Sequence, residues 1–379
     1  MNKKKIKILG SGPTGSLLAI SLASENYNVT LIDPLSEASL SKKDKGYAIT
    51  QSSREIFIKL GLWNDIKKFA KGFNSLSIID DELSQTVIVR KKDLKKFNYD
   101  QNNIGWVIEH KFLMKIFLEK INKNKYIHKL HKDIANDKNF DFILAADGRD
   151  SSTRESWGIK YIKRLYRQRC ISFRAVLRNA PKKRAYEIFR FEGPLALLPL
   201  ENDIYQVIWF SRESETEANI KLSNTELLKK LSNILPDKIK PEIIVSDIAN
   251  YSVAKAFALP KFYNFKNILV GDAAHSFHPV GGQGLNSCIR DVYELSNMIL
   301  NYDKLSIISR KIFSLNFFLN RFIDILSLLI FTDFLIKLFS NKFIILFPVR
   351  SLIFYMLRKI KLLRVNVFSL MTDSIKRYS

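Results

Sequence analysis

Short apolar runs and helix-forming segments alternate near the amino terminus. Residues 6–9 form a brief apolar run, residues 16–23 are helix formers, and a second apolar run covers 28–33. Brief apolar runs bounded by turn residues are typical of buried strands, whereas a longer run of helix formers predicts a helix. The pattern therefore predicts a strand, a tight turn, a helix and a second strand in this order.

Similar segments recur along the rest of the chain. Five runs read as further strands, namely 140–146, 168–178, 193–200, 204–210 and 267–270. A helix is predicted after the last strand, and its apolar stripe holds Cys288, Ile289, Val292, Leu295 and Ile299. Strands that alternate with helices indicate an α/β fold with a parallel sheet.

The first predicted turn is rich in glycine. Gly10, Gly12 and Gly15 follow the strand in G-x-G-x-x-G register. Here the first glycine permits the turn, the second lets the backbone approach a pyrophosphate, and the third lets the helix pack on the strand. Asp33 ends the second strand, where it can accept hydrogen bonds from ribose hydroxyls. The turn fits a dinucleotide, although an ordinary glycine-rich turn has the same spacing.

Two later strands also end at glycine and aspartate. Asp147 and Gly148 begin a D-G-x-x-S-x-x-R motif, and Gly271 and Asp272 begin the stretch GDAAHSFHPVGGQGLN. The carboxyl ends of parallel strands lie at one edge of a sheet, so we expect the three corners to converge there. One long ligand would then lie across them.

Composition adds limits to this interpretation. A chain of 379 residues suggests one large or two closely joined domains. Cys170 and Cys288 lie far apart without metal-like spacing, which disfavours a disulfide framework or a zinc site and is typical of an intracellular protein.

The net charge of +24 is spread over many lysines, and no basic-aromatic motif indicates nucleic acid. The basic amino terminus imitates a secretory signal, but the glycine register argues against one.

Together, the three glycine-containing motifs resemble those of the FAD-dependent aromatic hydroxylases, the class A flavoprotein monooxygenases. Three further stretches, 47–63, 191–200 and 332–341, are similar to the ubiquinone-biosynthesis hydroxylase branch, so the resemblance covers nearly the whole chain. It implies a fold like that of 4-hydroxybenzoate hydroxylase. We therefore expect an α/β protein with a Rossmann-like parallel sheet that binds FAD, an interleaved β-rich substrate domain and a helical C-terminal region.

The resemblance also implies a division of the chain into three parts. The FAD-binding domain is expected to be discontinuous and to comprise 1–75, 100–154 and 261–300. The substrate domain is expected at 76–99 plus 155–260, and the helical membrane-surface region at 301–379.

Roles for individual residues follow from the same resemblance. The glycines of the first turn would hold the FAD pyrophosphate, and Asp33 would bind the adenosine ribose. Asp147 and Gly148 would serve FAD and the approach of reduced nicotinamide, and Asp272 would bind the ribityl hydroxyls or lie near the pyrophosphate. The complete expected set is Gly10, Gly12, Gly15, Asp33, Lys45, Lys111, Asp147, Gly148, Gly271, Asp272, Pro279, Gly281, Gly282, Gln283, Gly284 and Asn286.

The glycine-rich turn at 281–284 would serve the flavin ring itself. Pro279 would lie beside the isoalloxazine, and the backbone N–H groups of the turn would face its pyrimidine edge. Reduced flavin is negatively charged at that edge, and a helix N-terminus stabilises negative charge without a cationic side chain. Lysines depart from the family pattern at two places: Lys45 stands where an arginine is usual, and Lys111 lies in the segment Glu-His-Lys in place of Glu-Asn-Arg. Asp33 also replaces the commoner glutamate, and the stretch 122–140 is shorter than usual. A lysine cannot reproduce the forked contact of arginine.

The chemistry implied is oxygen insertion with NAD(P)H as reductant. Reduced FAD and O2 would form a C4a-hydroperoxide, whose distal oxygen is transferred to the ring of a polyprenylated phenol in ubiquinone biosynthesis. The middle segment 155–260 would cover the site and exclude water. His275 and His278 are candidates for proton transfer or for structural hydrogen bonding, with a metal site as a minor alternative. Arg154 would either pair with Asp147 or cap its turn.

The C-terminal region is rich in Phe, Leu and Ile, yet Arg321, Asp324, Asp333, Lys337 and Arg350 interrupt it. Such a segment does not predict a transmembrane helix, since a span needs about 20 predominantly apolar residues. Residues 301–379 hold 13 Lys and Arg against four Asp. We therefore expect a cytoplasmic protein that lies peripherally on the anionic surface of the inner membrane. Other quinone-biosynthesis enzymes are candidate partners, and nucleic acid is not expected as one. Helices that only form a bundle core with a solvated basic face are the alternative.

Two other functions remain open at this point. A flavin-dependent isoprenoid reductase would share the dinucleotide-binding half of the chain. A basic membrane-surface or nucleic-acid-binding protein would use the nucleotide fold only as a scaffold.

Overall fold

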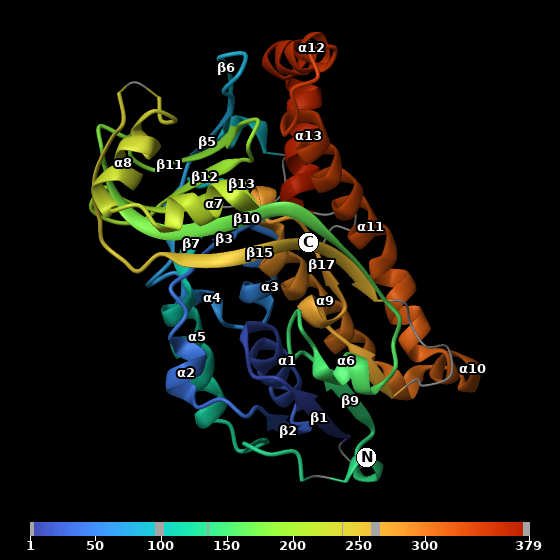
Figure 1. Ribbon diagram of the computed structural model, residues 1–379. Helices are drawn as coiled ribbons and strands as arrows, with labels where there is room; N and C mark the ends of the chain where they lie inside the picture. The colour runs from blue at the N-terminus through green and yellow to red at the C-terminus, as the bar shows by residue number, and fades with distance from the viewer. Residues whose placement is uncertain (1–3, 95–101, 135, 237, 259–265, 374–379) are drawn as a thin grey trace.

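The computed structural model describes residues 4–94, 102–134, 136–236, 238–258 and 266–373. The domain limits expected at 99–100 and 260–261 lie outside these residues. A parallel sheet with its helices occupies one end of the molecule, a larger mixed sheet lies at the other end, and C-terminal helices run along one side of both (Figure 1). This arrangement confirms the expected fold class.

The parallel sheet has five strands in the order β16-β9-β1-β2-β8. Its strands are β1 (Lys5–Leu9), β2 (Asn28–Ile32), β8 (Ile127–Leu130), β9 (Phe142–Ala145) and β16 (Asn267–Leu269). Helix α1 (Pro13–Ala23) follows β1 directly and packs against α5 (His110–Asn122) and α9 (Gln283–Leu300). One face of the central strands carries Ile6, Ile8, Val29 and Leu31, which pack in one core with apolar residues of α1, α5 and α9.

The mixed sheet contains nine strands around the long, bent β10. Eight of them follow the order β17-β15-β10-β13-β12-β11-β5-β6, and β14 pairs with β10. Their bounds are β5 (Ser75–Asp80), β6 (Gln85–Arg90), β10 (Tyr161–Arg178), β11 (Arg184–Phe189), β12 (Leu195–Pro199), β13 (Ile204–Arg212), β14 (Lys240–Ile244), β15 (Ala249–Ala258) and β17 (His275–Ser276). One face of this sheet packs with α8 (Asn224–Ser232) in a separate core, so its other face is turned toward the rest of the molecule.

Smaller elements connect the two sheets. A three-stranded sheet has the order β3-β7-β4, with β3 (Gly46–Ile49), β4 (Lys71–Phe73) and β7 (Gly105–Glu109). The remaining helices before α9 are α2 (Glu37–Ser41), α3 (Gln51–Lys59), α4 (Trp63–Ile66), α6 (Ser152–Ser156) and α7 (Glu213–Ile220). A one-turn 3-10 helix, η4 (Val280–Gly282), leads into α9.

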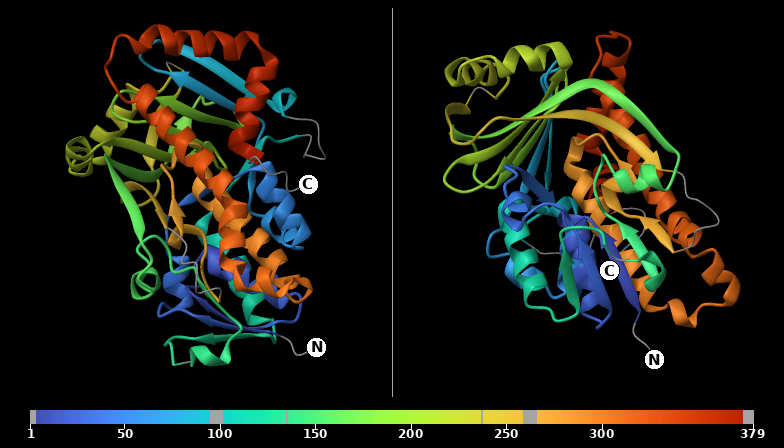
Figure 2. Two further views of the ribbon diagram at one scale, coloured as in Figure 1. Left: turned by 90° about the vertical axis from the view of Figure 1, so that its right-hand side faces the viewer. Right: turned by 60° about the horizontal axis from the view of Figure 1, so that its bottom comes forward.

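Four helices form the C-terminal region, namely α10 (Ile307–Lys311), α11 (Phe313–Phe339), α12 (Leu346–Lys359) and α13 (Lys361–Asp373). Helix α11 crosses from the parallel-sheet end to the mixed-sheet end, and α12 and α13 turn back over β6 and toward α3 (Figure 2). Over the described residues, none of the helices combines the length and the apolar character needed to cross a bilayer.

Buried ion pairs explain the charges that interrupt this apolar region. Arg350 of α12 donates to both carboxylate oxygens of Asp80 on β5, and both side chains are fully buried. Arg321 of α11 donates to Asp291 of α9 at 2.7 Å. Lys255 of β15 pairs with Asp333 of α11 at 2.8 Å. These charges therefore fasten the C-terminal helices to the mixed sheet and to α9.

Candidate active site at the carboxyl edge of the parallel sheet

The three glycine-aspartate corners meet at one edge of the parallel sheet, as the sequence predicts. Leu9 pairs with Ala145, and Ala145 pairs with Leu269, so β1, β9 and β16 end side by side. Gly10 has φ +96, and a Cβ atom there would lie 2.6 Å from the carbonyl oxygen of Ala146. Only glycine fits this conformation and this contact.

The third corner also touches the first turn directly. A Cβ atom on Gly271 would lie 2.9 Å from Cγ2 of Thr14, and the N–H of Gly271 donates to Asp291 at 3.0 Å. Arg154 joins the second and third corners, because its Nη1 donates to the carbonyl groups of Arg149 and Ala273. The bond to Arg149 lies within the turn that follows Asp147, which agrees with the capping role expected for Arg154.

The geometry of the first turn fits a dinucleotide such as FAD. Helix α1 begins at the turn with no side chain capping its N-terminus, which leaves backbone N–H groups for an anion. A Cβ atom on Gly15 would lie 1.8 Å from the Gly10 oxygen, so this glycine serves the packing of the helix. In contrast, Cβ atoms on Gly12, Gly148 and Gly284 would meet no atom within 4 Å. These three glycines therefore border space that protein atoms do not fill.

The three aspartates differ in what they bind. Asp33 accepts from the N–H groups of Ser11 at 2.7 Å and Leu35 at 2.9 Å, which holds its carboxylate beside the first turn. Asp147 accepts from the N–H of Thr153 with Oδ2, whereas its buried Oδ1 has no partner among the described residues. Asp272 is exposed. An unsatisfied buried oxygen of Asp147 matches a site that hydrogen-bonds a polar ligand.

Gly281 and Gly282 make a left-handed turn into α9. Their φ angles are +71 and +65, and Gly282 caps the helix without a side-chain bond. Asn286 holds this turn in place: its Nδ2 donates to the carbonyl groups of Ala48 and Gly282, each at 2.8 Å, and its Oδ1 accepts from the N–H of Thr50. The helix begins at Gln283, because the glycine pair completes the reversal of the chain.

Other predicted residues near this turn have the following positions. Pro279 is exposed at the start of the turn, and Gln283 is buried with its Nε2 donating to the Gly281 carbonyl at 3.1 Å. Lys45 is exposed, 5.2 Å from the ring centroid of Tyr47. Lys111 pairs with Glu109 at the start of α5.

His278 is fully buried and its imidazole is held on both sides. Its Nδ1 accepts from the N–H of Val280 at 3.2 Å, so Nε2 carries the proton and donates to Oε1 of Gln168 at 3.1 Å. Burial lowers the pKa of His278 to about 3, which keeps the ring neutral. These contacts favour the structural alternative for this histidine.

His275 belongs to a buried charge network. Its Nε2 lies 2.6 Å from Oδ2 of Asp291, which also binds Arg321, and Arg321 continues to Asp324 at 2.7 Å. Burial alone would raise the pKa of Asp291, but the charges of His275 and Arg321 hold it below its ordinary value. No three His, Cys, Asp or Glu side chains cluster as metal ligands would within the described ranges. The buried thiol predicted for Cys288 is confirmed, and its pKa is raised by burial.

An apolar cavity of about 440 Å³ lies against the glycine turn. The turn contributes Pro279, Gly281, Gly282 and Gln283, and helices α11, α12 and α13 contribute apolar side chains. The mixed sheet supplies the third wall through alternate residues of β5, β11, β12 and β13, as the two-residue period of strands requires. The cavity therefore connects the predicted flavin-ring position with the C-terminal helices.

One carboxyl group in this wall was not predicted from the sequence. On β11 the cavity face carries Ala185, Glu187 and Phe189. Glu187 is only 7% exposed, and burial raises its pKa from 4.5 to about 8, although the N–H of Gly281 donates to it. The signal in the sequence is a glutamate at a position where the alternation of an amphipathic strand expects an apolar residue.

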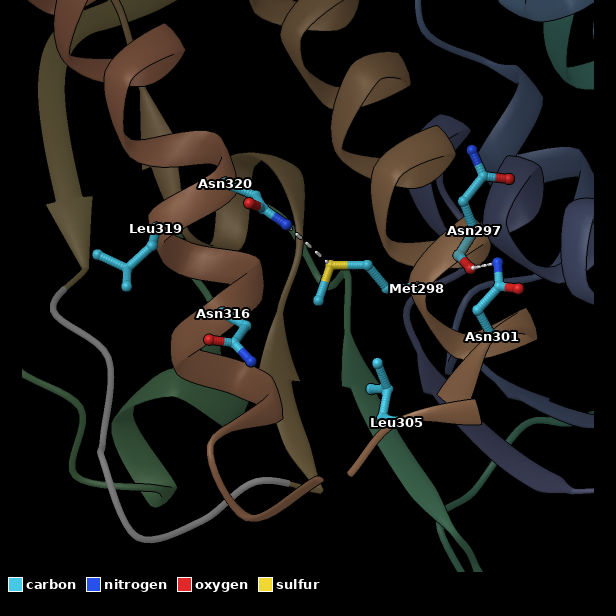
Figure 3. A pocket seen from close by; sticks show the side chains of 7 residues that line it. All are labelled: Asn297, Met298, Asn301, Leu305, Asn316, Leu319 and Asn320. Carbon is cyan, nitrogen blue, oxygen red and sulfur yellow. Dashed lines mark hydrogen bonds between the residues drawn. The ribbon is translucent and has the colours of Figure 1, made fainter. Parts of the chain in front are cut away.

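A second, more open cleft of about 510 Å³ has a different lining. It lies between the end of α9 and the start of α11, where Nδ2 of Asn320 donates to the sulfur of Met298 at 3.5 Å (Figure 3). The other lining residues are Asn297, Asn301, Leu305, Asn316 and Leu319. The glycine turn lies at the opposite end of α9, roughly 20 Å away at 1.5 Å per residue. This cleft is therefore separate from the candidate active site.

Comparisons with known proteins agree with this geometry. Residues 129–302 match the family described as FAD binding domain. The ubiquinone hydroxylase UbiM of Neisseria meningitidis is 26% identical, with 79% of this chain and 69% of the relative covered. The 3-demethoxyubiquinol 3-hydroxylase of Escherichia coli is 24% identical, with 78% of this chain and 80% of the relative covered.

A solved structure supports the fold over the full length. The p-nitrophenol 4-monooxygenase PnpA of Pseudomonas putida superposes with a TM-score of 0.77 at 16% identity, covering 99% of both chains. The mixed sheet and the C-terminal helices therefore belong to the shared fold together with the dinucleotide-binding part.

Proposed function

The chain belongs to the class A FAD-dependent monooxygenases, and on that premise we propose that it hydroxylates the aromatic ring of a prenylated phenol in ubiquinone biosynthesis, using O2 and NAD(P)H. The observation that carries this proposal is the apolar cavity that begins at the Pro279–Gln283 turn. An aromatic ring would lie at the turn, and an isoprenoid tail would extend between the sheet and the C-terminal helices. The names of the relatives favour this reaction over isoprenoid reduction and over a non-enzymatic binding protein.

We assign the binding of FAD to the predicted residues at the three corners. The uncapped N-terminus of α1 and the bare backbone at Gly12 would receive the pyrophosphate, and Asp33 would keep lone pairs for the ribose. The unpartnered oxygen of Asp147 would accept from the cofactor or from a water beside it. Bound FAD supplies the activation of O2, which protein side chains cannot perform. The uncapped N-terminus of α9, which follows the glycine turn, would place backbone N–H groups at the flavin ring.

The cavity walls would exclude water during the reaction. Of the wall residues on the mixed sheet, Leu76, Ile78, Phe189, Leu198 and Ile208 are apolar. A dry site suppresses the release of hydrogen peroxide in place of product. The domain limits expected from the sequence remain part of this proposal, with the mixed sheet as the substrate domain.

The decisive experiment uses the purified protein with FAD, NAD(P)H and a short-tailed prenylated phenol. We expect a product that carries one additional oxygen atom from isotopically labelled O2, detected by mass spectrometry. Ala196→Leu, which fills the cavity, should keep FAD but release hydrogen peroxide in place of product. Ala38→Leu on exposed α2 is the matched control. Oxidation of NAD(P)H without any hydroxylated product from the wild type would refute the proposal.

We propose further that the protein docks on an anionic membrane surface through α11 and α12. Helix α11 exposes one apolar stripe, Leu319, Ile323, Leu326, Ile330 and Phe334. Phe334 is 49% exposed and also lines the cavity, so the cavity opens toward this stripe. Lys342, Arg358, Lys359 and Lys361 are exposed at the ends of α12, where each would add about 1 kcal/mol near an anionic leaflet. Flotation with anionic vesicles at low salt tests this docking, and a protein left in the lower fractions would contradict it.

A further inference from the structure

Glu187 is the one charged side chain among the described residues that line the apolar cavity. It lies on β11 directly opposite Ala196 of β12, and Ala185 is its neighbour on the same face. Both alanines are small, so they leave room beside the carboxyl group. The N–H of Gly281 donates to this group, which places it next to the turn assigned to the flavin ring.

The carboxyl group is not satisfied by the protein. Its Oε1 is buried and has no hydrogen-bond partner among the described residues. Leaving a buried polar atom without a partner destabilises the fold, and an apolar residue would avoid that loss on this face. A group retained at such a cost fits a site that completes its hydrogen bonds with a ligand.

No nearby side chain neutralises Glu187. The segments facing it from β5, β12, α3 and the C-terminal helices contribute only apolar residues and Thr50 and Thr372 to the lining, and the turn contributes backbone and Gln283. Tyr186 is the only other titratable residue of the described lining. It packs in the core on the other face of the sheet, and burial raises its pKa, so it stays neutral.

We propose that Glu187 is a catalytic base that receives the proton of the substrate's ring hydroxyl. This inference rests on the proposed function, because it requires a phenol in the cavity. The phenolic O–H bond breaks, its electron pair stays on the ring oxygen, and the proton forms an O–H bond with the Glu187 carboxylate. No atom changes its oxidation state in this step. The negative charge then spreads to the ring carbons and makes them better nucleophiles for the incoming oxygen.

Matching of proton affinities supports the assignment. A phenol has a pKa of about 10, and an ordinary carboxylate, near 4, is too weak a base to share its proton. Burial raises the pKa of Glu187 to about 8, which narrows the difference. A base is most effective when its pKa lies near the working pH.

The test measures protons taken up when a phenol binds, without turnover. Oxidised holoenzyme is titrated with 4-nitrophenol at about pH 9 in two buffers of different ionisation heat. At this pH both the free probe and free Glu187 are ionised, so the bound pair must take up close to one proton in order to share a single negative charge. Between about pH 8 and pH 10 the affinity of the wild type should fall roughly tenfold per pH unit.

Two variants of Glu187 separate the roles of charge and shape. Glu187→Gln keeps the size and Glu187→Leu removes the polar atoms; both should bind the probe with no proton uptake and with affinity independent of pH. Flavin content and thermal unfolding establish that each variant is folded. Glu217→Gln, an exposed carboxyl on α7, should behave as the wild type. Equal proton uptake in wild type and Glu187→Gln, or none in the wild type, would overturn the assignment.

The same variants connect binding to turnover. Glu187→Gln should lower the rate of product formation by roughly 100-fold and should abolish the rise in rate between about pH 7 and pH 9. Product formation by the wild type tests the proposed function separately. If the wild type hydroxylates the phenol and Glu187→Gln keeps the same rate and pH profile, the base is wrong and the function stands.

Discussion

The glycines of the first turn serve two different physical purposes. Gly15 lies against the Gly10 carbonyl, so its missing side chain is a requirement of the fold. Gly12 has φ −63, which any residue can adopt, and no protein atom lies where its Cβ would be. We therefore propose that its missing side chain serves the ligand.

This difference predicts opposite outcomes for two substitutions. Gly12→Val should leave the unfolding temperature nearly unchanged and should abolish FAD binding, because the side chain fills the pyrophosphate position. Gly15→Ala should lower the free energy of unfolding by more than the ~1–3 kcal/mol that is usual for overpacking, because the new Cβ atom would clash with the backbone of Gly10. Flavin absorbance per polypeptide and thermal unfolding check both. Normal flavin content in Gly12→Val would refute the assigned pyrophosphate site.

Glu187 makes stability depend on pH in a defined direction. In the unfolded chain it ionises near its ordinary pKa of 4.5, whereas in the fold it keeps its proton to about pH 8. Between these values the unfolded state binds fewer protons, so the free energy of unfolding falls by ~1.4 kcal/mol per pH unit, and above pH 8 the loss is complete.

Urea unfolding of wild type and Glu187→Gln measures this effect. The variant should gain stability relative to the wild type as the pH rises from about 5 to 8, and the difference should then stay constant. Glu217→Gln should follow the wild type. A constant difference across the whole range would mean that Glu187 is ionised in the fold.

At the scale of elements, the sequence predicts the strands and helices whose signal lies in a local pattern of residues. The strands that end at the three corners, and the stripe of α9 from Cys288 to Ile299, were predictable because glycine spacing and apolar periodicity are local signals. Strand β10 begins seven residues before the predicted run. Its first half is mostly exposed and polar, and it is extended because it pairs with β15 from Tyr161 to Leu165. Pairing between distant segments leaves no such pattern in either one.

The candidate site divides in the same way. The FAD-side residues belong to contiguous motifs, so their convergence could be inferred from strand order. The cavity instead combines β5, β11, β12, β13 and three C-terminal helices, and its location follows only from their packing. Glu187 was missed for this reason, since nothing local shows which face of β11 meets the glycine turn.

The pair Arg350–Asp80 should control how α12 is held on the mixed sheet. Both side chains are fully buried, and Arg350 also lies 5.2 Å from the ring of Phe339. Removing one partner leaves the other charge buried and unpaired, so Arg350→Met should lower the free energy of unfolding by about 3–5 kcal/mol. The double variant Arg350→Met with Asp80→Leu should recover most of that loss. Chemical unfolding of the wild type and the two variants measures this, and equal stability of Arg350→Met and wild type would show that the pair contributes nothing.

At the scale of the whole molecule, the C-terminal helices join two tasks. Their inner face completes the cavity through residues such as Leu335, Phe339 and Phe354, and their outer face is apolar and exposed, with no covering element among the described residues. Exposing the apolar outer face of such a helix to water is unfavourable, and buried ion pairs hold the helix in this position. We therefore expect its outer face to contact another apolar phase. A substrate with a long isoprenoid tail would be drawn from that same phase.

The outer face predicts a separation between membrane binding and chemistry. Ile323 and Ile330 are 62% and 61% exposed and do not line the cavity. Replacing both with Asp removes apolar contact and adds negative charge beside an anionic leaflet, so flotation with vesicles should be lost. Activity on a water-soluble, short-tailed phenol should be unchanged. Activity on a long-tailed substrate in vesicles should fall roughly tenfold or more, because each of the two apolar side chains contributes about 1.5–3 kcal/mol when it is buried. Exposed Glu217→Gln is the control for a surface change elsewhere. Equal losses on both substrates would mean that the substitutions disturb the cavity itself, and α11 would then be a structural wall with no role in docking.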